Sequence, residues 1–90
     1  MTWNNEGRQA KQVDYCRKWL QGCRRTKTPQ VNAYSLKHWL ERKRSAEAQT
    51  RYEDYYIGED ALLRACELEG FLVRRERLQN LVGVSKRDCT

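Results

Sequence analysis

Hydrophobic residues along the chain first recur at helical spacing, in three separate stripes, and then change to the pattern of two short strands. The first stripe predicts a helix over residues 7–24, preceded by a flexible arm of residues 1–6. Its members recur at intervals of three and four: Val13, Cys16, Leu20 and Cys23. Pro29 disfavours helical geometry at the residue before it, so this segment is broken before the second stripe begins.

The second stripe is short and predicts a helix over residues 35–49. Leu36, Trp39 and Leu40 form its apolar face, and the Ser35 hydroxyl is suited to capping the amides of its first turn. The far half of this helix is polar on every side, which predicts that it projects into solvent or frays.

The third stripe predicts a helix over residues 58–69 with a broad buried face. Its apolar members are Ala61, Leu62, Leu63, Ala65, Cys66 and Leu68. Glu59 and Asp60 stand in its first turn, where carboxylates suit the positive end of the helix dipole. Gly70 follows as a C-terminal cap residue that tolerates a left-handed conformation.

The pattern after Gly70 predicts a β-hairpin over residues 71–87. Residues 71–75 and 81–85 are patterned as strands, with a turn over residues 77–80 in which Asn80 suits a positive φ. The length allows one small domain, residues 1–90. We therefore expect a mainly α fold with a small C-terminal β-hairpin, in which three helices and the hairpin follow the order of a winged-helix-like domain.

Charge adds a functional signal to this pattern. The chain is 33% charged residues with a formal net charge of +6, which favours a polyanionic partner such as nucleic acid. The charges are also segregated along the chain. Basic residues concentrate in residues 24–51 and 71–90, whereas residues 52–70 carry six acids against Arg64 alone.

This segregation argues against ordinary insertion of the third helix into the major groove of DNA. In a helix-turn-helix that helix enters the groove, and here its carboxylates would repel phosphates. We expect instead that the two basic stretches converge on a common surface and clasp a nucleic-acid backbone, while the acidic helix faces away. The predicted contacts are Arg42, Lys43, Arg44, Arg74, Arg75, Arg77, Lys86 and Arg87. For the first three, a solvated helix end is an equally good interpretation.

A protein partner is the alternative to nucleic acid. A domain with a basic face, an acidic helix and aromatic side chains can dock on another protein by charge complementarity. Aromatic residues dominate interface energetics, so the candidate anchors are Trp3, Tyr52 and Tyr55, followed by Tyr15 and Trp19. Core packing is the competing interpretation for most of these residues. The stripe of the first helix likewise suits either a homodimer contact or the core.

No motif indicates an enzyme. His38 is the only histidine and has no evident partner carboxylate by spacing, so a structural role is expected for it. The sequence leaves open a Cys–His pair assembled in space, but it has no phosphate-cradling glycine loop. The four cysteines lack the spacing of a zinc site and are interpreted as small buried hydrophobes, with Cys89 exposed near the C-terminus. We expect neither a cofactor nor a metal.

The compartment is predicted from two absences in the sequence. The first residues contain no apolar segment of the kind found in a signal peptide. No apolar run is long enough to cross a membrane. A cytoplasmic location without a membrane partner is therefore expected.

Two blocks within residues 34–71 resemble small proteins of phages and other bacterial mobile elements. The first runs from Tyr34 to Glu41, and the second from Tyr56 to Ala65 is followed by Gly70-Phe71. This chain has Gly58-Glu59-Asp60 where those proteins have a Ser/Ala-Asn-Gly turn. The resemblance implies a mobile-element origin, with the bacterial host cytoplasm as location, and it brings no activity and no catalytic residues.

These observations predict a non-catalytic protein that binds nucleic acid or a nucleoprotein complex through a basic face. The alternative is an inhibitor or adaptor that binds a host protein. Small phage proteins often occlude a host machine, and anti-CRISPR proteins are one such group. A basic face would suit competition for guide RNA or DNA, and the acidic segment would suit local imitation of nucleic acid.

Overall fold

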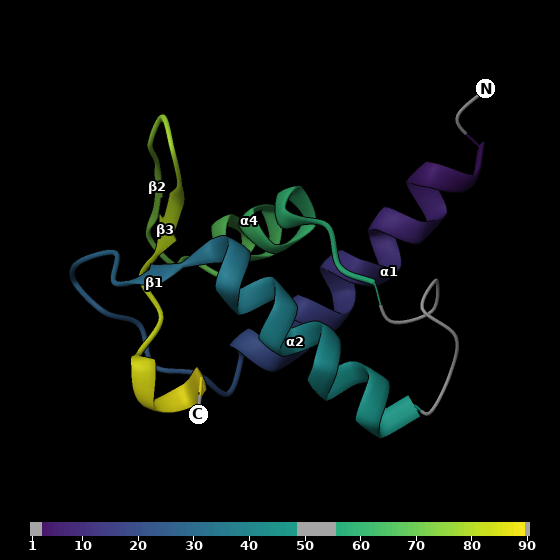
Figure 1. Ribbon diagram of the computed structural model, residues 1–90, viewed down its shortest axis with the longest axis horizontal. Helices are drawn as coiled ribbons and strands as arrows, with labels where there is room; N and C mark the ends of the chain where they lie inside the picture. The colour runs from purple at the N-terminus through teal and green to yellow at the C-terminus, as the bar shows by residue number, and fades with distance from the viewer. Residues whose placement is uncertain (1–2, 49–55, 90) are drawn as a thin grey trace.

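The computed structural model describes residues 3–48 and 56–89, and Figure 1 shows their arrangement. Helices dominate, and three very short strands form a small sheet at one side. In chain order the elements are α1 (Trp3–Leu20), β1 (Val31–Asn32), α2 (Ala33–Ala48), α4 (Glu59–Leu68), β2 (Val73–Arg75), β3 (Asn80–Val82) and a 3₁₀ turn, η1 (Lys86–Cys89). The predicted mainly α fold with a C-terminal hairpin is confirmed.

The sheet is antiparallel with strand order β1-β3-β2. Val82 sits at its centre, opposite Val31 of β1 on one side and Val73 of β2 on the other. The strand β1 is an addition to the predicted hairpin, because a two-residue strand leaves no periodicity to detect. With β1 included, the element order and sheet order are those of a winged-helix-like domain, in which α4 occupies the place of the recognition helix and the β2–β3 hairpin that of the wing.

One core joins the three helices of the described residues and the sheet. Its largest fully buried side chains are Leu20, Leu36, Leu40, Ile57, Leu62, Leu63, Val82, Val84, Cys16 and Cys66. Since Cys16 and Leu20 belong to this core and Val13 and Cys23 pack against it, the stripe of the first helix is used largely inside the domain. Tyr15 and Trp19 also pack against the core, and the Trp19 ring lies 5.6 Å from that of Trp39.

The first helix is displaced toward the N-terminus relative to its prediction. It begins at Trp3, so residues 3–6 are helical and do not form the expected arm. It ends at Leu20 rather than at residue 24. The reason is tertiary, because the backbone after Gly22 bonds to the far end of the chain: the Arg24 carbonyl accepts from the Ser85 amide at 3.0 Å, and Arg25 forms a β-bridge with Val84.

The second helix has a different cap from the one predicted. The Asn32 side-chain oxygen accepts a hydrogen bond from the Ser35 amide at 3.0 Å, so Asn32 is the N-cap and Ser35 lies inside the first turn. Both residues are good capping types, and β1 decides between them because it holds Asn32 in extended conformation directly before the helix.

The third predicted helix corresponds to α4 and matches its prediction within one residue at each end. Gly70 has a φ of +80°. The Phe71 amide donates to the Cys66 carbonyl and the Gly70 amide to the Glu67 carbonyl, which together form the expected glycine cap. The guanidinium of Arg25 adds two bonds to the Glu69 carbonyl, so a distant residue completes this helix end.

The hairpin strands are shorter than predicted, and Asn80 belongs to β3, opposite Arg75, rather than to the turn. Gly83 follows β3 where three segments meet. A Cβ atom at this position would lie 3.0 Å from the Leu72 Cβ and 3.1 Å from the Thr26 carbonyl oxygen. The close approach lets the Gly83 amide bond to Leu72 while its carbonyl accepts from the Thr26 amide.

The interpretation of the cysteines is confirmed for Cys16 and Cys66, which are fully buried. Burial raises the pKa of both thiols to about 12. Cys23 is partly buried, and its thiol donates to the Trp19 carbonyl. The side chain of Cys89 lies outside the described residues.

We predict that Cys16 and Cys66 resist alkylation in the folded protein. Alkylation requires an exposed thiolate, and both the burial and the high pKa oppose it at pH 8. Iodoacetamide labelling followed by peptide mapping, with and without urea, measures this. Equal labelling rates of Cys16 in the native and the urea-unfolded protein would contradict the described core.

Candidate nucleic-acid interface and the Glu41 network

The residues predicted to contact phosphate lie in two separate regions of the molecule. In Figure 1 the β2–β3 hairpin and the C-terminal turn stand on one side, and the C-terminal half of α2 points to the opposite lower corner. The expected convergence on one surface is therefore wrong for the part of the first basic stretch that lies on α2. The reason is the length and direction of α2, which carries Arg42, Lys43 and Arg44 away from the sheet.

Of the three predicted phosphate contacts on α2, two have internal partners. Lys43 forms an ion pair of 2.7 Å with Glu47. The Arg44 guanidinium lies over the Tyr15 ring at 5.1 Å and donates to the Tyr56 carbonyl at 3.5 Å. Arg42 is exposed and forms no ion pair with any residue that the structure describes. The alternative interpretation of this segment as a solvated helix surface therefore agrees better with its contacts.

Two of the three hairpin arginines are also paired. Arg74 contacts Glu76 at 2.9 Å, and Arg75 contacts Glu67 of α4 at 3.0 Å. Both pairs are exposed, so they reduce local charge without contributing much stability. Arg77 is exposed near the hairpin tip and has no ion-pair partner among residues 9–47 and 56–88, whose side chains are described.

The C-terminal cations Lys86 and Arg87 acquire neighbours that the site prediction did not include. Residues 24–28 run alongside the segment after β3, where the Arg25–Val84 bridge and the bond from the Thr26 amide to the Gly83 carbonyl hold them. The Asp88 carboxylate accepts from the Arg24 amide at 2.8 Å. These bonds place Arg24 beside the C-terminal turn, and Lys27 directly after the residue that bonds to Gly83.

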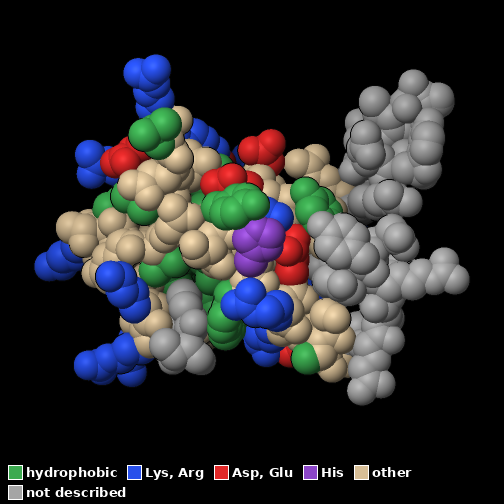
Figure 2. Space-filling model, in the orientation of Figure 1, with side chains coloured by type: hydrophobic (Ala, Val, Ile, Leu, Met, Phe, Trp, Pro, Cys, Tyr) green, Lys and Arg blue, Asp and Glu red, His purple; other side chains and the backbone are tan. Residues whose placement is uncertain are grey.

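We call the resulting surface the basic edge. It comprises Arg24, Lys27, Arg74, Arg77, Lys86 and Arg87. Figure 2 shows Lys and Arg side chains distributed along this side of the molecule, from the hairpin to the C-terminal turn. Counting charges along the chain identified all of these residues as basic. It gave no sign that residues 24–26 lie alongside residues 83–85, because that contact depends on a β-bridge and backbone hydrogen bonds between distant segments.

The acids of α4 are largely used inside the molecule. Glu67 pairs with Arg75, Glu69 with Arg17 at 2.6 Å, and Glu59 accepts from the Asn80 amide at 2.9 Å. The hydrogen bond from Arg17 lowers the pKa of Glu69. The carboxylates therefore tie α4 to α1 and to the hairpin. Asp60 and Arg64 are the charged residues of α4 that remain exposed without a described ion-pair partner.

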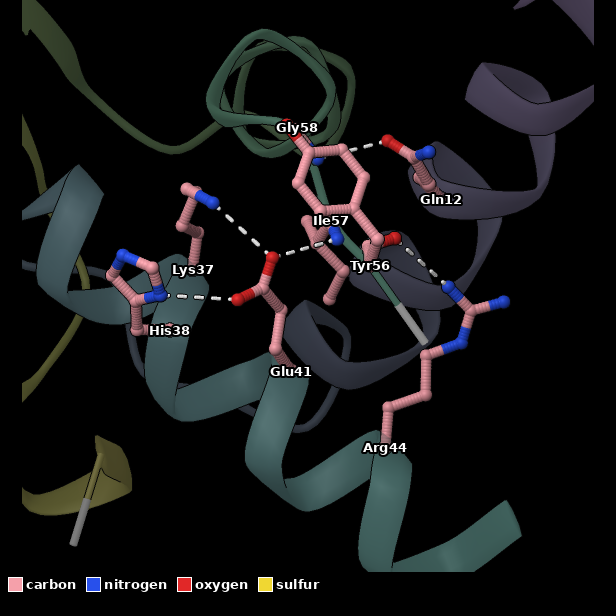
Figure 3. Close-up of polar contacts among 8 residues, drawn as sticks. All are labelled: Gln12, Lys37, His38, Glu41, Arg44, Tyr56, Ile57 and Gly58. Carbon is pink, nitrogen blue, oxygen red and sulfur yellow. Dashed lines mark hydrogen bonds and ion pairs between the residues drawn. The ribbon is translucent and has the colours of Figure 1, made fainter. Parts of the chain in front are cut away.

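A buried charge network lies between α2 and the segment that leads into α4 (Figure 3). The Glu41 carboxylate accepts from Lys37 Nζ at 3.1 Å and from the Ile57 amide at 3.0 Å, and its other oxygen lies 3.0 Å from His38 Nδ1. Lys37 and Glu41 are each only 6% exposed. The expectation that His38 lacks a carboxylate partner is wrong, since Glu41 follows it by three residues on the same helix face.

Two tyrosines border this network. Lys37 Nζ lies 4.8 Å from the centre of the Tyr56 ring and 5.5 Å from that of Tyr34. The His38 ring meets Tyr34 edge-on at 4.5 Å. The next amide, that of Gly58, donates to the Gln12 side chain of α1 at 2.9 Å. Glu41 and Gln12 together therefore fix the chain entering α4.

The His38 ring contacts the Glu41 carboxylate and the Tyr34 ring. Within the described part of the chain, no group of three or more His, Cys, Asp and Glu side chains is placed to hold a metal ion. No helix found there is both long and apolar enough to cross a lipid bilayer.

Of the candidate protein anchors, Tyr52 and Tyr55 lie outside the described residues, and Trp3 lies in α1 with its side chain outside them. Comparison with protein-family models, with curated proteins and with solved structures found no match. Its function is therefore inferred from the contacts of this chain alone.

We predict that Glu41→Ala destabilises the protein by about 3–5 kcal/mol, because it leaves the buried Lys37 ammonium unpaired. Glu47→Ala, which removes a carboxylate from an exposed pair, should cost less than about 1 kcal/mol. Urea unfolding followed by circular dichroism compares the two variants. Similar unfolding free energies for both would show that the Glu41 network does not hold the fold together.

Proposed function

We propose that this protein is a non-catalytic nucleic-acid-binding domain that holds the phosphate backbone along the basic edge. The observation that carries the proposal is the meeting of three separate segments, residues 24–27, 74–77 and 86–87, at one side of the molecule. Each brings at least one exposed cation to that side. Clustered cations of this kind bind polyanions by releasing condensed counterions, and a net charge of +6 supports the same ligand class.

The acids near the basic edge, Asp88 and Glu76, leave most of its cations without an ion pair. The Asp88 carboxylate bonds to a backbone amide, that of Arg24, and Glu76 pairs with Arg74. Arg24, Lys27, Arg77 and Lys86 then have no ion pair with a described residue. They can meet phosphates without first breaking an internal contact.

The charges of α4 suit a domain that contacts the nucleic-acid backbone better than one that inserts α4 into a DNA groove. The exposed charges of this helix are Asp60, Arg64 and Glu67; Glu67 is paired with Arg75 of the hairpin, and the half-buried Glu59 accepts from Asn80. A groove-inserted α4 would bring these carboxylates close to phosphates. Phosphate contacts made from the basic edge position the domain without reading sequence.

A host-protein partner remains the second candidate, and one observation favours it. A groove of about 550 Å³ lies between α1 and α4, lined by apolar Ala10, Val13 and Leu68, by Gln9 and Asp14, and by Arg17 and Arg64. Arg17 is paired with Glu69, so Arg64 is the lining cation without a described ion pair. The apolar residues suit the apolar face of an amphipathic segment. In the alternative of an anti-CRISPR-like inhibitor, the host protein would dock in this groove. A complex that survives nuclease treatment in a pulldown would favour this function, and loss of all partners would favour nucleic acid.

We predict that the double variant Lys27→Glu/Lys86→Glu binds nucleic acid much more weakly than the unmodified protein. Loss of two phosphate contacts should reduce the slope of log affinity against log salt by about 2. Fluorescence anisotropy with labelled oligonucleotides, repeated over a range of NaCl concentrations, measures both quantities.

The matched control is Lys11→Glu/Lys18→Glu, which makes the same change in net charge on α1, away from the basic edge. It should retain most of the affinity and the original salt slope. Equal weakening by both double variants would mean that only the overall charge matters. Arg42→Glu tests the α2 segment separately and should have little effect.

A further inference from the structure

A cavity of about 390 Å³ lies under the hairpin tip, between the start of α2 and the first turn of α4. Its lining is unusual for this molecule because amide and hydroxyl side chains converge on it from three elements. They are Asn32, Ser35, Gln79 and Asn80, accompanied by Tyr34, Glu59, Glu76, Arg77 and Leu78. This volume is within the range of ligand sites in proteins.

Two of the most exposed large hydrophobic side chains in the described chain line this one cavity. Leu78, at the hairpin tip, is 93% exposed, and Tyr34, on α2, is 56% exposed. Neither contributes to the core. They stand on different elements on the two sides of a polar floor, so a flat ligand entering the cavity can contact an aromatic face and an aliphatic side chain together.

The floor of the cavity is held in place by internal hydrogen bonds. Asn32 donates to Gln79 at 3.0 Å, linking β1 to the hairpin, and Asn80 donates to Glu59 at 2.9 Å, linking the hairpin to α4. These bonds leave one carboxylate oxygen of Glu59 and the amide oxygen of Asn80 without a described partner. Both are acceptors, which suit the amino groups that nucleobases display.

The Tyr34 ring is held from behind by the Glu41 network. Lys37 lies over the ring, His38 meets it edge-on, and both side chains are bonded to Glu41. Holding the ring in place lowers the entropic cost of stacking a ligand on it. Tyr34 is exposed to solvent and is held by the buried Lys37–Glu41 pair. It is therefore suited to stacking against a flat ligand.

We propose that this cavity receives an unpaired nucleobase from a single-stranded nucleic acid whose backbone follows the basic edge. The base stacks against Tyr34, contacts Leu78, and bonds through its edge to the polar floor, while Arg77 at the rim meets the adjacent phosphate. Base recognition by stacking between aromatic and apolar side chains together with edge hydrogen bonds has this form. A base within a duplex remains stacked on its neighbours and does not reach a concave site, so single strands are the preferred ligand.

This inference rests on the proposed function, since it names the strand state of the nucleic acid that the basic edge holds. The carboxylates of Glu59 and Glu76 would otherwise suit a cationic peptide. Glu76 is already paired with Arg74, and Arg77 also lines the cavity, so the lining has little net negative charge to attract one.

The test is binding of a short fluorescein-labelled single-stranded oligonucleotide, measured by anisotropy beside a duplex of the same length. Tyr34→Ala and Leu78→Ala should each weaken single-strand binding, the tyrosine variant by about tenfold. The salt slope should stay unchanged, because stacking releases no counterions. Tyr34→Phe keeps the ring and should retain the affinity.

Leu72→Ala is the matched control for Leu78→Ala, since Leu72 is 45% exposed, precedes β2 and does not line the cavity. Melting temperatures of all variants establish that they fold. Full binding by Tyr34→Ala and Leu78→Ala, together with weak binding by Lys27→Glu/Lys86→Glu, would overturn the base pocket and leave the proposed function standing. Duplex binding as tight as single-strand binding would also overturn it, and absence of binding to either strand form would overturn both proposals.

Discussion

The buried carboxylate of Glu41 attaches the segment before α4 to α2. A buried charge is stable only when it is paired and hydrogen-bonded. Glu41 meets this requirement with Lys37 and His38 on its own helix and with the Ile57 amide from another segment (Figure 3). Only the last of these bonds joins distant parts of the chain. It fixes where the polypeptide enters α4, and therefore where α4 packs.

Once α4 is fixed, its acidic residues determine where positive charge remains available. Glu69 takes Arg17 of α1, and Glu67 takes Arg75 of the hairpin. Arg25 is used in capping the end of the helix. Arg24, Lys27, Arg77 and Lys86 have no ion pair with a described residue and lie along the sheet side. Lys11, Arg42 and Arg64 likewise have no described ion pair but lie on the helices. The acids at α4 thus neutralise basic residues of other elements, and the segregation of charge along the sequence reflects this packing.

Sequence reasoning succeeded where a signal is local and failed where it depends on a distant partner. The spacing of apolar residues located α4 closely, and Gly70 was identified as its cap, because both signals lie within the element itself. The end of α1 and the cap of α2 were wrong, because β1 and the bridge to Val84 decide them. Of the candidate site, the hairpin and C-terminal cations were predicted, but their neighbours Arg24 and Lys27 and the cavity beside Tyr34 were not.

Residue types and their spacing within single elements were enough to predict a small helical domain with a hairpin, a net positive charge and a concentration of acids in residues 52–70. The packing of distant segments sets which charges neutralise one another. It also separates Arg42, Lys43 and Arg44 of α2 from the hairpin and brings Tyr34 and Leu78 to one cavity. The physical reason is that ion pairs and pockets form between residues that are distant along the chain, and their positions depend on the packing of the whole core.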